Sequence, residues 1–150
     1  MRRLIALIVL ALCALTAGAQ AERPQPVHWG ATLGTLRSVD HRYTVKLTAD
    51  IDPGWHLYAM HQPDVEALAT EVALAGNDRA ELLRVNEQQP HVTFESGART
   101  AWFASDAVFT LQVRAARPTT LHVLARYQVC NDRMCLPVAT VNLPVTLPAK

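Results

Sequence analysis

The stretch Tyr43-Thr-Val-Lys-Leu-Thr-Ala-Asp-Ile51 decides the fold. Its odd-numbered positions carry apolar side chains and its even-numbered positions carry polar ones, the pattern of a strand with one buried and one solvent-facing side. The turn-forming sequence Asp52-Pro-Gly54 ends this strand. The residues from Trp55 to Tyr58 then resume an extended run.

The same alternation recurs along the rest of the chain. Further short strands are predicted at residues 72–74, 82–85, 109–113, 121–127 and 141–147. The first two flank a Gly76-Asn77 turn. About seven short strands, with no internal repeat and no second domain, predict a single-domain, all-β fold, an antiparallel β-sandwich.

Three segments depart from this alternation. Residues 64–74 have a helix-forming composition, and Pro63 suits the start of a helix. Residues 22–30, with two prolines, are predicted to be an extended lead-in. Residues 88–105 carry aromatic side chains without a clear period, so we expect a long loop folded over something. A short extended piece is expected there near Trp102-Phe103.

The N-terminus has the pattern of a cleavable secretory signal peptide over residues 1–21. Arg2 and Arg3 give the positive start, residues 4–15 are almost wholly apolar, and Ala19-Gln-Ala21 is a small-x-small cleavage site. The apolar run is shorter than the roughly 20 residues of a membrane span. We therefore expect cleavage after Ala21 and a soluble, periplasmic domain of residues 22–150.

Charge and histidine spacing exclude some function classes. Removing the leader removes two of the 14 Lys and Arg residues and none of the 13 Asp and Glu residues, which leaves one net negative charge. A chain without a basic run is not expected to bind nucleic acid or an anionic membrane. The six histidines lack the close spacing of metal ligands, so no metal and no cofactor are expected.

Cys130 and Cys135 are the only cysteine pair left once the leader, with Cys13, is removed. A disulfide needs Cα atoms roughly 4.4–6.8 Å apart, so the chain must reverse between them. Asn131 and Asp132 are suited to that reversal. Export allows the disulfide to form and persist. The pair is either a structural staple of a hairpin or a labile, exchangeable disulfide.

Three landmarks appear in a recognisable order. They are Gly54-Trp-His-Leu-Tyr58, then Phe94-x-x-Gly97, then Tyr127-Gln-Val-Cys130 followed by Cys135-x-Pro137. In this order, behind a signal peptide, they resemble the N-terminal periplasmic domain of DsbD-type thiol-disulfide interchange proteins. The resemblance covers roughly residues 30–148.

The resemblance implies an immunoglobulin-like sandwich with the cysteines on a hairpin under an aromatic cap loop. It further implies a thiol-disulfide oxidoreductase of the protein-disulfide reductase type. Cys135 would form the mixed disulfide and Cys130 would resolve it. Phe94 would be the cap aromatic, and Tyr58 would line the site.

The implied partners are periplasmic thioredoxin-fold proteins, of the disulfide isomerase or cytochrome c maturation type, and a membrane-linked thiol donor. Known members continue into a membrane-spanning carrier and a thioredoxin domain, whereas this sequence stops at Lys150, which indicates a stand-alone form. The loop between the cysteines is a residue shorter than theirs. Val92 and Thr93 stand where their cap loop is acidic.

Two other functions remain open. The chain could be a non-redox β-sandwich adaptor whose disulfide only fastens a hairpin. It could also be a Cu(I)-handling domain, with Met60-His61 and the cysteines as soft ligands. A small exchange protein has no need to dimerise, so a monomer is expected.

Overall fold

The computed structural model describes residues 24–34, 41–64, 69–76, 79–95, 97–116 and 118–148, and all regular structure in these ranges is β-strand. The predicted leader lies outside the described residues, as does Asn77 of the predicted turn. The strands are β1 (Val27–Leu33), β2 (Arg42–Ile51), β3 (His56–Tyr58), β4 (Glu71–Leu74), β5 (Ala80–Glu87), β6 (His91–Glu95), β7 (Ala98–Phe103), β8 (Asp106–Ala115), β9 (Thr120–Tyr127), β10 (Val129–Cys130) and β11 (Ala139–Thr146).

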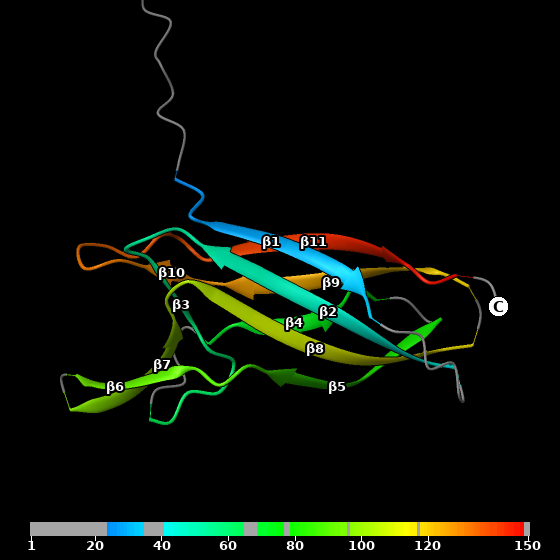
Figure 1. The fold of residues 1–150 in the computed structure, drawn as a ribbon, viewed down its shortest axis with the longest axis horizontal. Helices are drawn as coiled ribbons and strands as arrows, with labels where there is room; N and C mark the ends of the chain where they lie inside the picture. The colour runs from blue at the N-terminus through cyan, green and yellow to red at the C-terminus, as the bar shows by residue number, and fades with distance from the viewer. Residues whose placement is uncertain are drawn as a thin grey trace, which may run out of the picture.

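The strands form three antiparallel sheets. Two large sheets, in the orders β1-β2-β8-β5 and β11-β9-β4, face each other across the core. A third sheet, β10-β3-β7-β6, is built of shorter strands and is called the small sheet below. It lies at one end of the molecule, at the left in Figure 1. The predicted antiparallel β-sandwich is confirmed.

The core forms where the alternating patterns of neighbouring strands coincide. In β2 and β8 every second side chain is buried, and the register places Val45 opposite Leu111 and Leu47 opposite Phe109. Leu121 of β9 closes the core from the facing sheet. Each such side chain contributes about 1.5–3 kcal/mol by leaving water. A shift of one residue would turn all of them outward, so this burial fixes the register.

The predicted helix over residues 64–74 is wrong where the structure describes its C-terminal part. Glu71–Leu74 is strand β4, paired with β9 so that Val72 lies opposite Ala125. Burying Val72 and Leu74 against the core outweighs the weak helix propensity of this segment. The alternative prediction of a strand at residues 72–74 is confirmed. Residues 65–68 lie outside the described part of the chain.

The predicted long loop over residues 88–105 is also wrong. It contains the hairpin of β6 and β7, which Gly97 turns with a φ of 86°. The expected extended piece is confirmed, since Trp102 and Phe103 pair with β3. Phe103 is buried in the core, whereas Trp102 lies on the opposite face of the sheet. Aromatic side chains on both faces explain why the segment has no period of two.

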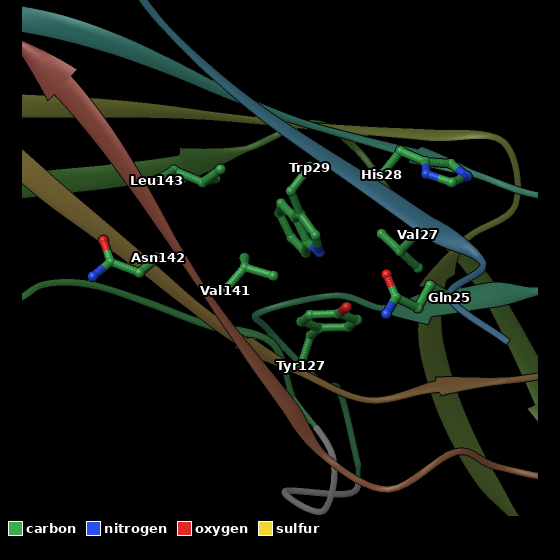
Figure 2. Close-up of a pocket in the computed structure, with 8 residues that line it drawn as sticks. All are labelled: Gln25, Val27, His28, Trp29, Tyr127, Val141, Asn142 and Leu143. Carbon is green, nitrogen blue, oxygen red and sulfur yellow. The ribbon is translucent and has the colours of Figure 1, made fainter. Parts of the chain in front are cut away.

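The extended lead-in predicted for residues 22–30 contains the start of strand β1, at Val27. This strand pairs with β2 along its whole length. A cavity of about 440 Å³ opens between β1 and β11. Figure 2 shows the indole of Trp29 facing Val141 and Tyr127 across it. The rings of Trp29 and Tyr127 have centroids 5.2 Å apart. Neither cysteine lines this cavity.

Candidate functional site

The chain changes sheets at Gln128. It leaves the β11-β9-β4 sheet at Tyr127 and enters the β10-β3-β7-β6 sheet at Val129. There Val129 lies opposite Leu57 and Cys130 lies opposite His56. Since Val129 and Leu57 are both buried in the core, their neighbours Cys130 and His56 lie on the outer face of the small sheet.

The turn after Cys130 is built by Asn131. Its backbone N–H donates to the carbonyl oxygen of Met134 at 2.9 Å. Its side-chain Oδ1 accepts from the backbone N–H groups of Arg133 and Met134, each at 2.9 Å. The predicted reversal at Asn131-Asp132 is confirmed, because an asparagine side chain replaces the backbone acceptor of the turn.

The turn brings the two cysteines together as a disulfide. Their Cα atoms are 4.0 Å apart, and the two residues form a single antiparallel bridge. On the far side of this bridge the N–H of Leu136 donates to the carbonyl oxygen of Val129 at 3.0 Å. Cys130 and Cys135 are therefore a non-hydrogen-bonded pair, the position in an antiparallel ladder where opposite side chains are closest.

The two cysteines differ in their access to solvent. Cys130 is 2% exposed, whereas Cys135 is exposed on the returning limb of the hairpin. Two exposed apolar side chains, Met134 at 54% and Val138 at 45%, flank Cys135. Cys135 is thus the more accessible residue of the pair.

A row of aromatic side chains runs from the disulfide across the outer face of the small sheet. Tyr58 lies two residues beyond His56 on β3 and opposite Trp102 of β7, and Trp102 lies opposite His91 of β6. The ring centroid of His56 is 5.7 Å from that of Tyr58 and 5.5 Å from that of Trp102. The structure thus places the predicted site residue Tyr58 on the face that carries Cys130.

Sequence reasoning missed His56, which lies opposite Cys130, and Trp102, whose ring lies next to that of His56. The available signal was the alternation of Trp55 to Tyr58, which puts His56 on the same face as Tyr58. The pairing of β3 with β10 was not available, because it joins segments far apart in the chain.

Phe94 occupies a different position from the other predicted site residues. It lies on β6, separated from β10 by the two strands β3 and β7, and is 71% exposed. Because His91 faces the same side as Trp102, the alternation of β6 puts Phe94 on the opposite side, with Val92. The structure therefore does not bring Phe94 over the disulfide.

Polar contacts hold the loop after β3 against β7. The side chain of Gln62 accepts from the N–H of Ala101 at 3.0 Å and donates to its carbonyl oxygen at 2.8 Å. Asp64 accepts two bonds from the Arg99 guanidinium, at 3.0 and 2.8 Å, and one from its backbone N–H. These bonds to Arg99 lower the pKa of Asp64 to about 2. The contacts fix the strand that carries Trp102.

Met60 and His61, the residues considered as soft metal ligands, are bound to a carboxylate. Glu87, whose side chain is 9% exposed, accepts from the N–H of Met60 at 2.7 Å and from the N–H of His61 at 3.1 Å. It also lies 2.7 Å from Nδ1 of His61. Within the described ranges, no group of three or more His, Cys, Asp or Glu side chains is arranged to hold a metal ion.

Where the structure describes the chain, no helix is long and apolar enough to cross a membrane.

Comparison with known families gives one match. The family model described as "Thiol:disulfide interchange protein DsbD, N-terminal" matches residues 32–146. The resemblance noted in the sequence is thereby confirmed. No curated protein sequence matches the chain.

Solved structures with the same fold include periplasmic redox domains at low identity. The N-terminal periplasmic domain of ScsB from Proteus mirabilis matches with a TM-score of 0.62 at 15% identity. The match covers 83% of this chain and 47% of that one, so the present chain spans about half its length.

Two further matches come from Neisseria meningitidis. Its DsbD N-terminal domain in the reduced form has a TM-score of 0.55 at 15% identity, covering 82% of this chain and 86% of that one. The complex between its DsbD N-terminal and PilB N-terminal domains gives 0.53 at 15% identity, covering 84% and 88%. These likenesses show the immunoglobulin-like sandwich fold.

Proposed function

The chain belongs to the family of the N-terminal domain of the thiol:disulfide interchange protein DsbD, and from that premise we propose that it exchanges disulfides with partner proteins through Cys130 and Cys135. The observation that carries the proposal is the difference in access between the two cysteines, one buried and one exposed. Exchange needs one sulfur that a partner can reach and a second sulfur nearby that resolves the mixed disulfide.

In the reduced protein, the thiolate of Cys135 attacks one sulfur of a partner disulfide. A bond forms between Cys135 Sγ and that sulfur, and the second partner sulfur leaves as a thiolate and takes up a proton. The thiolate of Cys130 then attacks Cys135 Sγ and releases the first partner sulfur, which also ends as a thiol. The partner gains two electrons and two protons, and this chain ends as the disulfide seen in the structure.

The partners in this proposal are periplasmic thioredoxin-fold proteins, with a membrane-linked thiol donor that reduces the chain again. Two observations support the compartment and the kind of partner: the similar ScsB domain is periplasmic, and the similar Neisseria domain was solved in a complex with a PilB domain. Residues 1–21 would direct export, and residues 22–150 would act in the periplasm as a monomer.

Single-cysteine variants test this proposal. We expect Cys130→Ser, which keeps the exposed sulfur, to accumulate a stable mixed disulfide with an oxidised periplasmic thioredoxin-fold protein. Cys135→Ser should accumulate far less, because its remaining sulfur is buried. The double variant is the control on non-reducing gels. Equal trapping by both single variants, or trapping by neither, would contradict the proposed roles.

The reduction potential of the pair separates exchange from a structural staple. Structural disulfides typically lie below about −300 mV. We expect a clearly less negative value when the mature protein is equilibrated with glutathione buffers. A lower value, with unfolding on reduction, would leave the chain as a binding module.

The cap role of Phe94 is part of the proposal and requires the β6–β7 hairpin to turn over and move toward β10, since Phe94 here faces away from the disulfide. Phe94→Ala should then speed oxidation of the reduced pair by a small oxidant such as hydrogen peroxide. Val92→Ala, on the same face of β6, is the control. An unchanged oxidation rate would remove the cap role and leave the exchange proposal intact.

A further inference from the structure

Gln128, the residue at which the chain changes sheets, carries an unusual amide. Its Nε2 donates to the carbonyl oxygen of Leu136, the residue after Cys135, at 2.8 Å. Its Oε1 is buried and has no hydrogen-bond partner. A buried acceptor without a donor costs free energy, and such groups are few in native structures. Rotating the amide would not help, because Oε1 would then face the Leu136 carbonyl oxygen.

The amide of Gln128 reaches the hairpin that holds the two cysteines. Tyr127 points inward to Trp29, and Val129 points inward with Leu57. Gln128 lies between them, at the break between β9 and β10 and two residues before Cys130. The hydrogen bond to Leu136 draws the side chain across the hairpin toward the limb that holds Cys135.

The oxidised pair has nothing to offer this acceptor, because a disulfide carries no proton. Reduction by a partner dithiol breaks the Sγ–Sγ bond, transfers two electrons and two protons to this chain and leaves the partner as a disulfide. A thiol S–H then appears at Cys130, which is 2% exposed. A thiol is a weak donor that needs an acceptor inside the protein.

We propose that Gln128 is a redox-linked positioning residue, whose Oε1 accepts the S–H of Cys130 in the reduced protein. The inference rests on the proposed exchange function and deepens it. A hydrogen bond to the neutral form of a group opposes its ionisation. Gln128 therefore opposes ionisation of Cys130 in the free reduced protein, so that Cys135 is the attacking thiolate and Cys130 ionises only to resolve the mixed disulfide. It also favours the dithiol over the disulfide, since the acceptor has a donor only after reduction.

Other titratable groups surround the pair and stay unchanged in the test. They are His56 and Tyr58 on β3, Asp132 and Arg133 in the turn, and Cys135 itself. Their contributions are common to all of the variants compared below.

Two substitutions separate the acceptor role of Gln128 Oε1 from the hydrogen bond that Nε2 donates to Leu136. Gln128→Met removes both the donor and the acceptor, whereas Gln128→Glu removes the donor and keeps an acceptor. In glutathione buffer, Gln128→Met should lower the equilibrium constant for reduction about threefold, which corresponds to about 14 mV more negative. Gln128→Glu should not lower it. Gln112→Met, on the exposed side of β8, is the matched control and should leave it unchanged.

A merely structural role would move both variants in the same direction, because both lose the bond to Leu136. That result would overturn the inference, as would an unchanged constant in Gln128→Met. The pKa of Cys130, measured by alkylation rate against pH in Cys135→Ser protein, should fall in the added Gln128→Met variant. Far-ultraviolet circular dichroism checks that each variant folds.

Infrared spectroscopy of the unsubstituted reduced protein gives an independent readout. The S–H stretch of Cys130 should lie at the lower frequency of a hydrogen-bonded thiol, and a free-thiol frequency would refute the bond. None of these measurements uses a partner protein. If they succeed while mixed-disulfide trapping fails, the proposed function is wrong and the Gln128 contact stands. If trapping succeeds while they fail, only the contact is wrong.

Discussion

Asn131 shows how much one side chain does at the disulfide. Its Oδ1 accepts the backbone N–H groups of Arg133 and Met134, of which an ordinary two-residue turn would satisfy only the second with a backbone carbonyl. The turn is thereby held by bonds that do not involve sulfur. When the disulfide opens, these bonds continue to hold Cys135 near Cys130, which keeps the effective concentration of one thiol at the other high.

Asn131→Ala should weaken this ordering of the reduced hairpin. Losing the turn bonds costs about 1 kcal/mol of preference for the closed arrangement. The reduction potential should then become less negative by about 20 mV, because the thiols meet less often. A glutathione titration measures the change, with Asp132→Ala as the control. A shift to a more negative potential would contradict this role of Asn131.

At the residue scale, the features that depend on residue type alone could be predicted from the sequence. The features that depend on which strands pair could not. The cysteine pair and the reversal at Asn131 followed from local chemistry, and Tyr58 was named as a site residue through the family resemblance. His56 and Gln128 did not, because their importance comes from the strand opposite them and from the change of sheet between Tyr127 and Val129. Those pairings join distant parts of the chain and have no local signature.

Among the elements, β8 is a central strand, since it lies between β2 and β5 in the larger sheet. Its Leu111 is 0% exposed and faces Val45 on one side and Val85 on the other. The inward-facing side chains of such a central strand are closed off from solvent, so they cannot rearrange into it after a neighbouring side chain is truncated. The stability of the sandwich should therefore respond strongly to changes on this strand.

Leu111→Ala should lower the free energy of unfolding by roughly 2–5 kcal/mol, since it removes buried methyl groups and leaves a cavity. Gln112→Ala, one residue along β8 on the solvent side, should change it by less than about 0.5 kcal/mol. Urea denaturation followed by circular dichroism measures both. Similar losses in the two variants would show that the register of β8 is not the one described.

An ion pair in the loop after β3 makes the stability of the folded state depend on pH. The pKa of Asp64 is lowered from 3.8 to about 2 by its bonds to Arg99, so the folded state holds the ionised form more strongly than the unfolded state does. The resulting stabilisation is present above pH 3.8 and is lost as the pH falls toward 2.

Asp64→Asn should therefore be less stable than the unsubstituted protein at pH 5, and this difference should shrink as the pH falls to 2. Urea midpoints at several pH values measure it, with Asp106→Asn as the control. A difference that stays constant over that range would show that the charge of Asp64 is not responsible.

The elements also show where prediction from sequence stops. β2, β8, β9 and β11 were predictable, because each has one buried and one solvent-facing side. The β6–β7 hairpin was not, because Phe103 and Trp102 place aromatic rings on both faces. β4 has two alternating apolar side chains in a helix-forming composition, and only its pairing with β9 decides its structure.

On the scale of the whole molecule, the disulfide lies apart from the core cluster. The buried cluster draws on the two large sheets and on the inner face of the small one, and the disulfide lies on the outer face. The ring it closes spans a sequence separation of five. Breaking such a small ring removes little constraint from the unfolded chain, about 2 kcal/mol in the chain-entropy account.

The sandwich should consequently remain folded when the disulfide is reduced. Far-ultraviolet circular dichroism should be unchanged in dithiothreitol, and the urea midpoint should fall only modestly. Cys130→Ser/Cys135→Ser should behave like the reduced protein. Cooperative unfolding on reduction would contradict this separation and favour the staple.

The change of sheet at Gln128 also has an evolutionary consequence. Substitutions in the turn of residues 131–134 or at the tip of the β6–β7 hairpin alter the surface around Cys135 without touching the strands that bury the core. Substitutions can therefore accumulate there at little cost to folding, while the inward-facing positions of the large sheets tolerate only apolar-for-apolar exchange. The fold itself is retained at low sequence identity, since the 15% identity to the Neisseria domain comes with a TM-score of 0.55.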